Sequence, residues 1–335
     1  MSVTDVAGVG LPDQDAYWAA VLDGDEQAAY AVATDCLARG VPLPTVLDGL
    51  VAGSQARVGD LWEANGFTVA QEHAATAVSE AVVARLAPLA AEPGGPRVLV
   101  ACAEREWHAL PALVVTHTLR AAGLRAEFVG ASASRDQVVA RILDTGPRLV
   151  LLSASVASSL PRVRRQVEAV RGTGTPVVVG GRAFGGDPVR AQRLGATACA
   201  ATPADVLRMI GTLPHHVPAA APLRGAAAQE ARSISAIADE VVRDVLAAPT
   251  VTAALGNHDG SPDDWTTVLS TFVPHVVDCV VGALLVEDPG VVSGERAWLE
   301  EVVAHRHGDP RAVDAVWVAL AARLREYPGA ARVLS

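Results

Sequence analysis

The feature that most constrains the fold is an alternation of apolar runs and helical patterns across the middle of the chain. Five short runs rich in valine, leucine and alanine predict strands at 97–103, 125–131, 148–155, 175–181 and 197–201. The helical patterns lie at about 112–122, 134–144, 160–171, 187–194 and 203–212. Continuous apolar strands separated by helices are typical of a parallel sheet that is covered on both faces. We therefore predict a flavodoxin-like, doubly wound domain with a parallel five-stranded sheet over 96–212.

Helical patterns flank this domain on both sides. Residues 14–92 contain four helical segments with short links, which predicts a cap bundle. Residues 1–13 are expected to form an N-terminal tail, and the proline-rich stretch 213–224 is expected to be a linker. Residues 225–335 predict a second all-helical domain, so the chain combines all-α and α/β domains.

Charge and residue usage exclude several classes of protein. The 335 residues carry a formal net charge of −10, and all 27 basic residues are arginines. Without lysine, the chain has neither a Schiff-base nor a P-loop lysine. The acidic balance argues against nucleic-acid binding. The sequence lacks a leader-like start and a long uncharged apolar run, so we expect a cytoplasmic protein that does not enter a membrane.

Three corner segments should meet at the carboxyl edge of the sheet, where doubly wound domains bind ligands. The first strand is followed by Glu106, Trp107 and His108, the third ends with Ser153 and Ser155, and the fourth ends with Gly180 and Gly181. Paired glycines allow close approach of a bulky group. A loop histidine can bind a metal while a nearby carboxylate accepts its other ring proton. This edge therefore predicts a site for a large ligand that contains a metal.

These corners resemble the cobalamin-binding domain, whose pattern is D-x-H-x-x-G, then S-x-L, then G-G. The resemblance implies that His108 is the lower cobalt ligand and Glu106 its partner. It also implies that Ser153 donates a hydrogen bond to the nucleotide tail, that Gly180 and Gly181 flank the tail, and that Trp107 and Ser155 contact the cofactor.

Three positions depart from that pattern: Glu106 replaces aspartate, Pro111 replaces glycine and Ser155 replaces leucine. The departures bear on how the tail packs more than on the ligand. The alternative is a plain flavodoxin-like domain with an incidental loop histidine.

A second motif lies in the predicted cap. Trp62 is followed, after nine residues, by Glu72 and His73. This spacing resembles the cap of CarH-type light sensors that bind adenosylcobalamin, and it implies that the tryptophan covers the upper cobalt face while the other two contact the adenosyl group. The family has a histidine where this chain has Glu63, so the lit-state ligand must be another group, with His73 and water as candidates. The alternative is that these residues belong to an ordinary helix core.

The C-terminal domain carries a weaker signal. The domain order resembles that of the photocobilins, which bind both cobalamin and biliverdin, the latter in a C-terminal helical, globin-like domain. That resemblance implies that His275 hydrogen-bonds a bilin pyrrole and that Cys279, on the same helix face, lies nearby. The alternative is that both side chains simply fill a core.

The resemblances together imply a light sensor rather than an enzyme, with adenosylcobalamin and biliverdin as cofactors. Light would cleave the cobalt–carbon bond, change domain packing and change self-association, so a light-dependent homo-oligomer is expected. The alternative is a corrinoid methyl-carrier protein that works with a methyltransferase. A third possibility is an interaction scaffold that binds no cobalamin.

Overall fold

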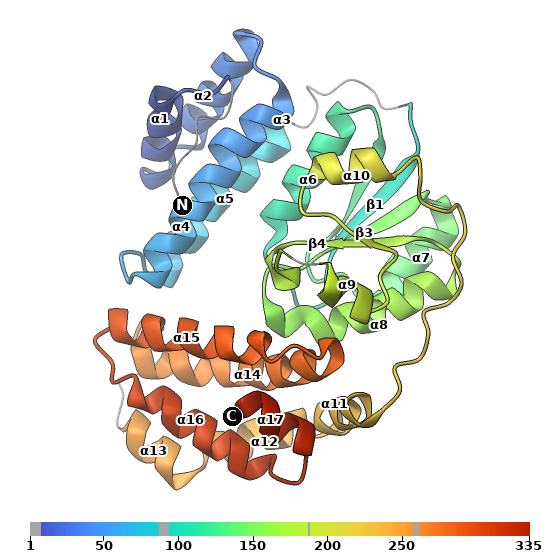
Figure 1. Ribbon diagram of the computed structural model, residues 1–335. Helices are drawn as coiled ribbons and strands as arrows, with labels where there is room; N and C mark the ends of the chain where they lie inside the picture. The colour runs from blue at the N-terminus through green and yellow to red at the C-terminus, as the bar shows by residue number, and fades with distance from the viewer. Residues whose placement is uncertain (1–7, 87–93, 187, 257–260) are drawn as a thin grey trace.

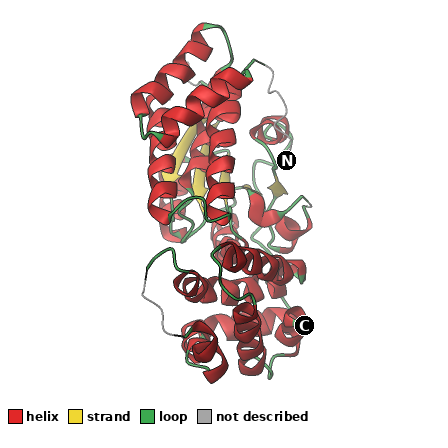
Figure 2. Cartoon of the chain, turned by 90° about the vertical axis from the view of Figure 1, so that its left-hand side faces the viewer, coloured by secondary structure: helices red, strands yellow, loops and turns green. Residues whose placement is uncertain are grey.

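The computed structural model describes residues 8–86, 94–186, 188–256 and 261–335. These residues form a helical cap, a sheet domain and a C-terminal helical domain (Figure 1). A view turned by 90° shows the same three units, with the strands enclosed by helices and the C-terminal helices below (Figure 2). The first seven residues of the predicted tail and the predicted boundary at residue 92 lie outside the described residues.

The cap is a compact bundle with one irregular helix. Its elements are α1 (Leu11–Leu22), α2 (Glu26–Ala38), α3 (Leu43–Val46), a π-helical turn η1 (Leu47–Ala52), α4 (Gly53–Glu63) and α5 (Val69–Leu86). The first helix begins inside the predicted tail because Asp13 accepts a hydrogen bond from the Gly10 N–H at 3.2 Å, which caps the helix there. The segment from α3 to α4 is continuous and corresponds to one of the four helical segments expected in the cap, interrupted by the π turn.

The sheet confirms the predicted topology. Its strands are β1 (Arg97–Cys102), β2 (Arg125–Gly130), β3 (Leu149–Ser153), β4 (Val177–Gly180) and β5 (Ala198–Cys199). All neighbours are parallel, in the order β2-β1-β3-β4-β5. Each strand ends one or two residues earlier than predicted, because the small residues that follow already belong to the corner loops. This strand order is that of flavodoxin-like folds, which bind ligands between β1 and β3.

Helices cover both faces of the sheet. They are α6 (Ala109–Ala121), α7 (Arg135–Thr145), α8 (Leu160–Gly172), α9 (Val189–Arg193) and α10 (Pro203–Met209), with short turns η3 (Ala157–Ser159) and η4 (Arg182–Phe184). Alternate residues of β1 are buried on opposite faces of the sheet. Val98 and Val100 face α6, whereas Leu99 and Ala101 face α7 and α8. On its other side, α6 packs against the cap through Leu110.

The C-terminal domain is built around one apolar helix. Its elements are α11 (Ala226–Ala236), α12 (Ala238–Leu246), α13 (Pro249–Leu255), α14 (Trp265–Val286), α15 (Gly290–His305), α16 (Arg311–Arg323) and α17 (Pro328–Leu334). Among the described helices, only α14 has the length and mean hydropathy, 1.9, that crossing a membrane would require. It packs against α11, α12, α15 and α17 within its domain and against α8 and η3 of the sheet domain. Its apolar composition is therefore explained by its place in a shared core.

His117 on α6 predicts a loss of stability in mild acid. The side chain is buried, its Nδ1 has no hydrogen-bond partner among the described residues, and burial lowers its pKa to about 4. Between pH 6.5 and about 4, His117 binds a proton in the unfolded chain but not in the folded chain. The free energy of unfolding therefore falls as the pH falls. The pKa difference corresponds to about 3 kcal/mol. Urea unfolding at several pH values should show this dependence reduced in His117→Gln and unchanged in His215→Gln, whose histidine is exposed. An equal acid dependence in both variants would contradict this assignment.

Candidate functional site

The loop after β1 is fixed by bonds from two neighbouring segments. Arg105 adopts a left-handed backbone conformation with φ of +62°, and its N–H donates to Ser132 Oγ at 3.0 Å. The Glu104 N–H donates to Gln166 Oε1 of α8 at 3.1 Å. The Ser132 N–H in turn donates to the Glu106 carbonyl at 2.8 Å. The short corner between β1 and α6 therefore has one defined conformation that turns Glu106 inward.

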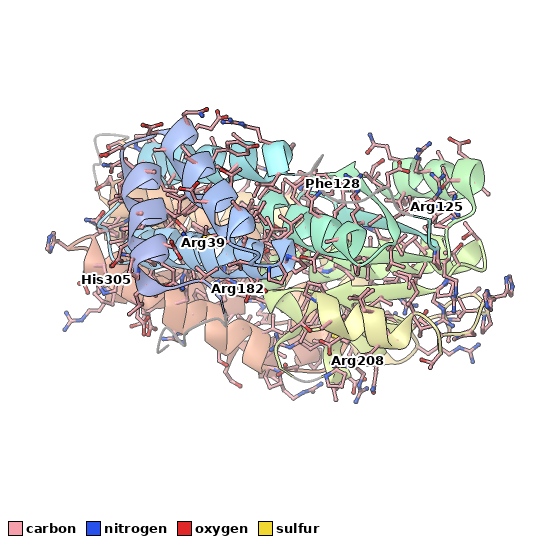
Figure 3. The ribbon with its side chains drawn as sticks, turned by 90° about the horizontal axis from the view of Figure 1, so that it is seen from above. Arg39, Arg125, Phe128, Arg182, Arg208 and His305 are labelled. Atoms are coloured by element: carbon pink, nitrogen blue, oxygen red, sulfur yellow. The ribbon has the colours of Figure 1, made fainter. Side chains whose placement is uncertain are left out.

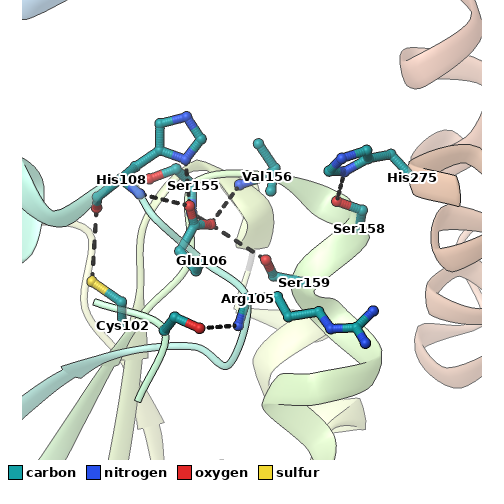
Figure 4. Close-up of polar contacts among 10 residues, drawn as sticks. Cys102, Arg105, Glu106, His108, Ser155, Val156, Ser158, Ser159 and His275 are labelled. Atoms are coloured by element: carbon teal, nitrogen blue, oxygen red, sulfur yellow. Dashed lines mark hydrogen bonds and ion pairs between the residues drawn. The ribbon is translucent and has the colours of Figure 1, made fainter. Parts of the chain in front are cut away.

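Glu106 joins the corners that follow β1 and β3 (Figure 4). Its carboxylate is fully buried, and one oxygen contacts His108 Nδ1. The other oxygen accepts hydrogen bonds from the Ser155 N–H at 2.8 Å, the Val156 N–H at 3.3 Å and the Ser159 hydroxyl at 3.3 Å. The carboxylate thus orients the imidazole and holds the loop after β3 in place.

The two side chains stabilise each other's charged forms. Burial alone would raise the pKa of Glu106, but the hydrogen bond from His108 and the bonds from backbone N–H groups outweigh it and lower that pKa. The hydrogen bond to Glu106 raises the pKa of His108 against the opposing effect of burial. The charge of Glu72 also raises the pKa of His108, and the charge of Arg182 lowers it. In the view from above, Arg182 is labelled between the cap and the sheet domain (Figure 3).

This edge suits a metal that brings most of its own ligands. Because Nδ1 of His108 bonds to Glu106, only Nε2 is left to coordinate, and the imidazole is about half exposed. The described part of the chain contains no group of three or more His, Cys, Asp or Glu side chains that could hold an ion by themselves. A single oriented imidazole would suit cobalt in a corrin ring, because His108 would hold the metal and the ring would supply most of its other ligands.

Ser153 and Gly180, two of the three predicted tail-binding residues, lie in one row across the sheet. Cys102, Ser153 and Gly180 are neighbours in register on β1, β3 and β4. A Cβ atom on Gly180 would lie 2.6 Å from the Ala200 carbonyl oxygen, and one on Gly181 would lie 2.3 Å from that of Ala154. Backbone packing within the fold therefore already requires this glycine pair, so the pair is not by itself a sign of a ligand.

Gly181→Ala is expected to destabilise the sheet domain by about 3 kcal/mol, because φ is +109° and the added Cβ would contact the Ala154 carbonyl. The matched control is Gly294→Ala on the exposed face of α15. There nothing lies within 4 Å of the added Cβ, and the change should be neutral or slightly stabilising. Urea unfolding measures both variants. Equal stabilities would contradict the close contact.

The cap motif reaches the same edge from the opposite side. Glu72 on α5 accepts a hydrogen bond from the Thr76 hydroxyl at 3.0 Å and contacts His73 Nδ1 at 2.6 Å. The side chain of His73 is exposed. Trp62, at the end of α4, instead stacks on Trp298 of α15, with ring centroids 6.0 Å apart. The contacts of Glu72 are therefore with its own helix, while its charge acts on His108, and Trp62 packs against the C-terminal domain.

The remaining predicted residues lie in different surroundings. Trp107 is 73% exposed beside His108, and the Ser155 N–H bonds to Glu106. His275 on α14 shares a 3.0 Å hydrogen bond with Ser158 Oγ, next to the residues that hold Glu106 (Figure 4). Cys279 is fully buried, and burial raises its thiol pKa well above the ordinary value, which disfavours a reactive thiolate.

A cavity of about 360 Å³ lies elsewhere, at the amino-terminal edge of the sheet. Arg97, Arg125 and Arg148 line it. These side chains already bond to Glu127, to the Gly95 carbonyl and to carbonyls near residue 213. We therefore do not associate this cavity with the predicted cofactor.

Comparison with known proteins finds matches for the sheet domain and the cap. Residues 96–209 match the family model described as a B12 binding domain, and residues 13–87 match a second model with the same description. The chain carries a two-part cobalamin-binding module. The matched segments correspond to the sheet domain and the cap, and neither extends into the C-terminal domain.

Of three similar solved structures, one shares the fold of this module with a TM-score above 0.5. The monomethylamine corrinoid protein of Methanosarcina barkeri superposes with a TM-score of 0.52 at 18% identity, over 60% of this chain and 98% of that one. A cobalamin-binding protein from Desulfitobacterium hafniense DCB-2 gives 0.34 at 19% identity, over 60% and 98%. The methanol:cobalamin methyltransferase complex of Methanosarcina barkeri gives 0.32 at 17%, over 61% and 81%. No curated protein sequence matches the chain.

Sequence reasoning missed several residues around the module. Ser132 and Gln166 fix the loop after β1, and Arg182 acts on His108 from the turn after β4. The signal for Arg182 was its place directly after the glycine pair. No local pattern indicated that Trp298 and Arg306 would contact Trp62, because these residues are more than 230 positions away in the sequence.

Proposed function

We propose that this chain is a light sensor that binds adenosylcobalamin through His108 and carries biliverdin as a second chromophore. The observation that carries the proposal is that α5, which bears Glu72 and His73, packs against α6, the helix that begins directly after His108, and that the charge of Glu72 raises the pKa of that imidazole. Bound adenosylcobalamin supplies a photolabile cobalt–carbon bond. On this proposal, Glu72 and His73 contact the adenosyl group and Glu106 holds His108 in position.

The signal would be a change of packing rather than a chemical product. The cap meets both other domains, through α6 of the sheet domain and α15 of the C-terminal domain. Loss of the adenosyl group would change how the cap sits on these contacts, and a change in self-association would follow. No residue is proposed as catalytic, and the protein is proposed to act in the cytoplasm.

The biliverdin part of the proposal rests on domain order and on one pair of side chains. His275 packs against Phe272, with ring centroids 5.1 Å apart, on the side of α14 that faces the sheet domain. These side chains would recognise a bilin pyrrole by a hydrogen bond and by ring stacking. Because Cys279 is buried, we propose that this biliverdin is not covalently attached.

A corrinoid methyl-carrier protein working with a methyltransferase is the second candidate. It is favoured by the fold shared with the monomethylamine corrinoid protein. A methyl carrier must leave the upper cobalt face open to its partner enzymes. The cap motif on α5, which packs against the helix that begins directly after His108, favours the sensor.

The experiment is reconstitution in the dark with adenosylcobalamin and biliverdin, followed by visible spectra and size-exclusion chromatography before and after green light. The sensor predicts irreversible conversion of the cobalamin spectrum, a far-red bilin band and a changed elution volume, while a dark sample stays constant. If methylcobalamin is retained but adenosylcobalamin is not, the methyl carrier is favoured. If the bilin band alone is missing, the biliverdin part of the proposal is wrong.

A further inference from the structure

The end of helix α4 is held by the C-terminal domain. Arg306, which follows α15, donates to the carbonyl oxygen of Trp62 at 2.8 Å and to that of Glu63 at 3.3 Å. His305 Nδ1 contacts the same Glu63 carbonyl at 3.1 Å, and Trp298 Nε1 donates to the Glu63 carboxylate at 3.1 Å. The carbonyls at a helix C-terminus lack partners within the helix, so donors from another domain complete this one.

Arg306 is in an unusual setting for a charged side chain. It is only 6% exposed, and burial lowers the pKa of its guanidinium against the opposing charge of Asp263. Its Nε has no hydrogen-bond partner among the residues that the structure describes. Three features offset the burial of its charge: the negative end of the α4 dipole, the negative charge of Asp263, and the face of the Trp62 ring, 4.5 Å from the guanidinium carbon. The position of Arg306 therefore depends on the cap being in contact.

Trp62 is enclosed by side chains of the C-terminal domain. Its ring is nearly parallel to that of Trp298, and Phe272 packs against both, with centroids 6.3 Å from Trp62 and 5.0 Å from Trp298. Exposure is intermediate for all three rings, so the cluster lies at the boundary between domains. A tryptophan held by two rings and a guanidinium has little freedom to change rotamer.

The C-terminal domain also contacts the segment after β3, which orients His108 through Glu106. His275 packs on Phe272 and bonds to Ser158, and Asp278 forms a 2.8 Å ion pair with Arg162, which also donates to the Ser158 carbonyl. The residue next to Ser158 donates to Glu106. Contacts thus run without interruption from the cap tryptophan, through α14 and α15, to the loop that orients His108.

We propose that the C-terminal domain is a bracket that fixes the spacing between Trp62 of the cap and the His108 loop, with Arg306 and Trp298 as the positioning residues for Trp62. Glu63, which stands where the CarH-type sensors have a histidine, then serves as an anchor for this bracket. The consequence for cobalamin rests on the proposed function, because it assumes that Trp62 covers the upper cobalt face. The bracket itself is a property of the protein alone.

The test compares Arg306→Gln with Arg190→Gln. Arg190 pairs with Asp288 at 2.8 Å and links the same domain to α9 rather than to the cap. In the full-length apoprotein, Arg306→Gln should speed hydrogen exchange of peptides covering 58–68 about ten-fold, since it removes a cation–π contact and two helix-capping bonds. Arg190→Gln should leave that exchange unchanged. Trp298→Phe keeps an aromatic ring but loses the N–H that donates to Glu63, so it should give a smaller increase in hydrogen exchange over 58–68. This variant replaces Arg306→Gln in the test if Arg306→Gln does not fold.

Adenosylcobalamin provides the second readout. Dissociation in the dark should be about ten-fold faster from Arg306→Gln than from the unmodified protein or Arg190→Gln, and Arg306→Lys should restore part of the difference. Equal exchange over 58–68 in the Arg306 and Arg190 variants would overturn the bracket. If Arg306→Gln changes hydrogen exchange over 58–68 but neither the unmodified protein nor any variant binds adenosylcobalamin, the bracket stands and the proposed function fails.

Discussion

His108→Ala is expected to abolish nitrogen-ligated cobalt in the reconstituted protein. The imidazole is held by Glu106 through Nδ1, so Nε2 is the one ring nitrogen free to bind a metal. Loss of the residue that binds the metal should lower cobalamin affinity by about a hundred-fold or more. Loss of a residue that only supports a metal ligand typically costs about 10- to 100-fold. The visible spectrum of the variant, titrated with adenosylcobalamin in the dark, should be that of cobalamin without a histidine ligand.

The matched control is His215→Ala, at an exposed position close to the amino-terminal edge of the sheet. Its spectrum and affinity should equal those of the unmodified protein. A His108→Ala protein that keeps the nitrogen-ligated spectrum would show that another residue binds cobalt.

Glu106→Leu is expected to cost about 3 kcal/mol or more of folding stability in the apoprotein. The substitution leaves the N–H groups of Ser155, Val156 and His108 and the hydroxyl of Ser159 without their common acceptor. Unpaired buried donors are costly, whereas Glu106→Gln keeps an acceptor oxygen and should lose less. Urea unfolding of the three proteins measures both differences.

The pH dependence of the Glu106 effect has a definite sign. The pKa of Glu106 is lowered from 4.5, so its stabilising charge is fully present above that value and is lost as the pH falls through the lower folded pKa. The pKa of His108 is raised from 6.5, so its charge stabilises below that value and the effect is lost as the pH rises through the higher folded pKa. The stability difference between the unmodified protein and Glu106→Gln should therefore be largest between pH 4.5 and 6.5. A difference that is constant with pH would contradict the ion pair.

The sheet domain was predictable because its signals are local. Each strand is a run of apolar residues, and β1 buries alternate residues on both faces as such runs require. The contact between Glu106 and His108 also joins residues two apart, and the structure confirms it. That His108 binds cobalt stays a prediction.

The cap and the C-terminal contacts were less predictable for a physical reason. The π turn at 47–52 leaves no clear mark in the residue pattern, and the start of α1 depends on one side-chain cap at Gly10. The spacing of Trp62 from Glu72 and His73 predicts that Trp62 contacts the cofactor. In the structure its aromatic and guanidinium neighbours come from α14, α15 and the turn after α15. Contacts between segments so far apart depend on how domains pack, which local sequence patterns do not specify.

The most direct test of cobalamin ligation by His108 is electron paramagnetic resonance of the cobalt(II) form in protein made with nitrogen-15 histidine. If one imidazole nitrogen binds cobalt, each cobalt line should be split into a triplet in ordinary protein and into a doublet in the labelled protein. His108→Ala should show neither splitting. A splitting that does not change with the label, or that persists in His108→Ala, would contradict His108 as the ligand.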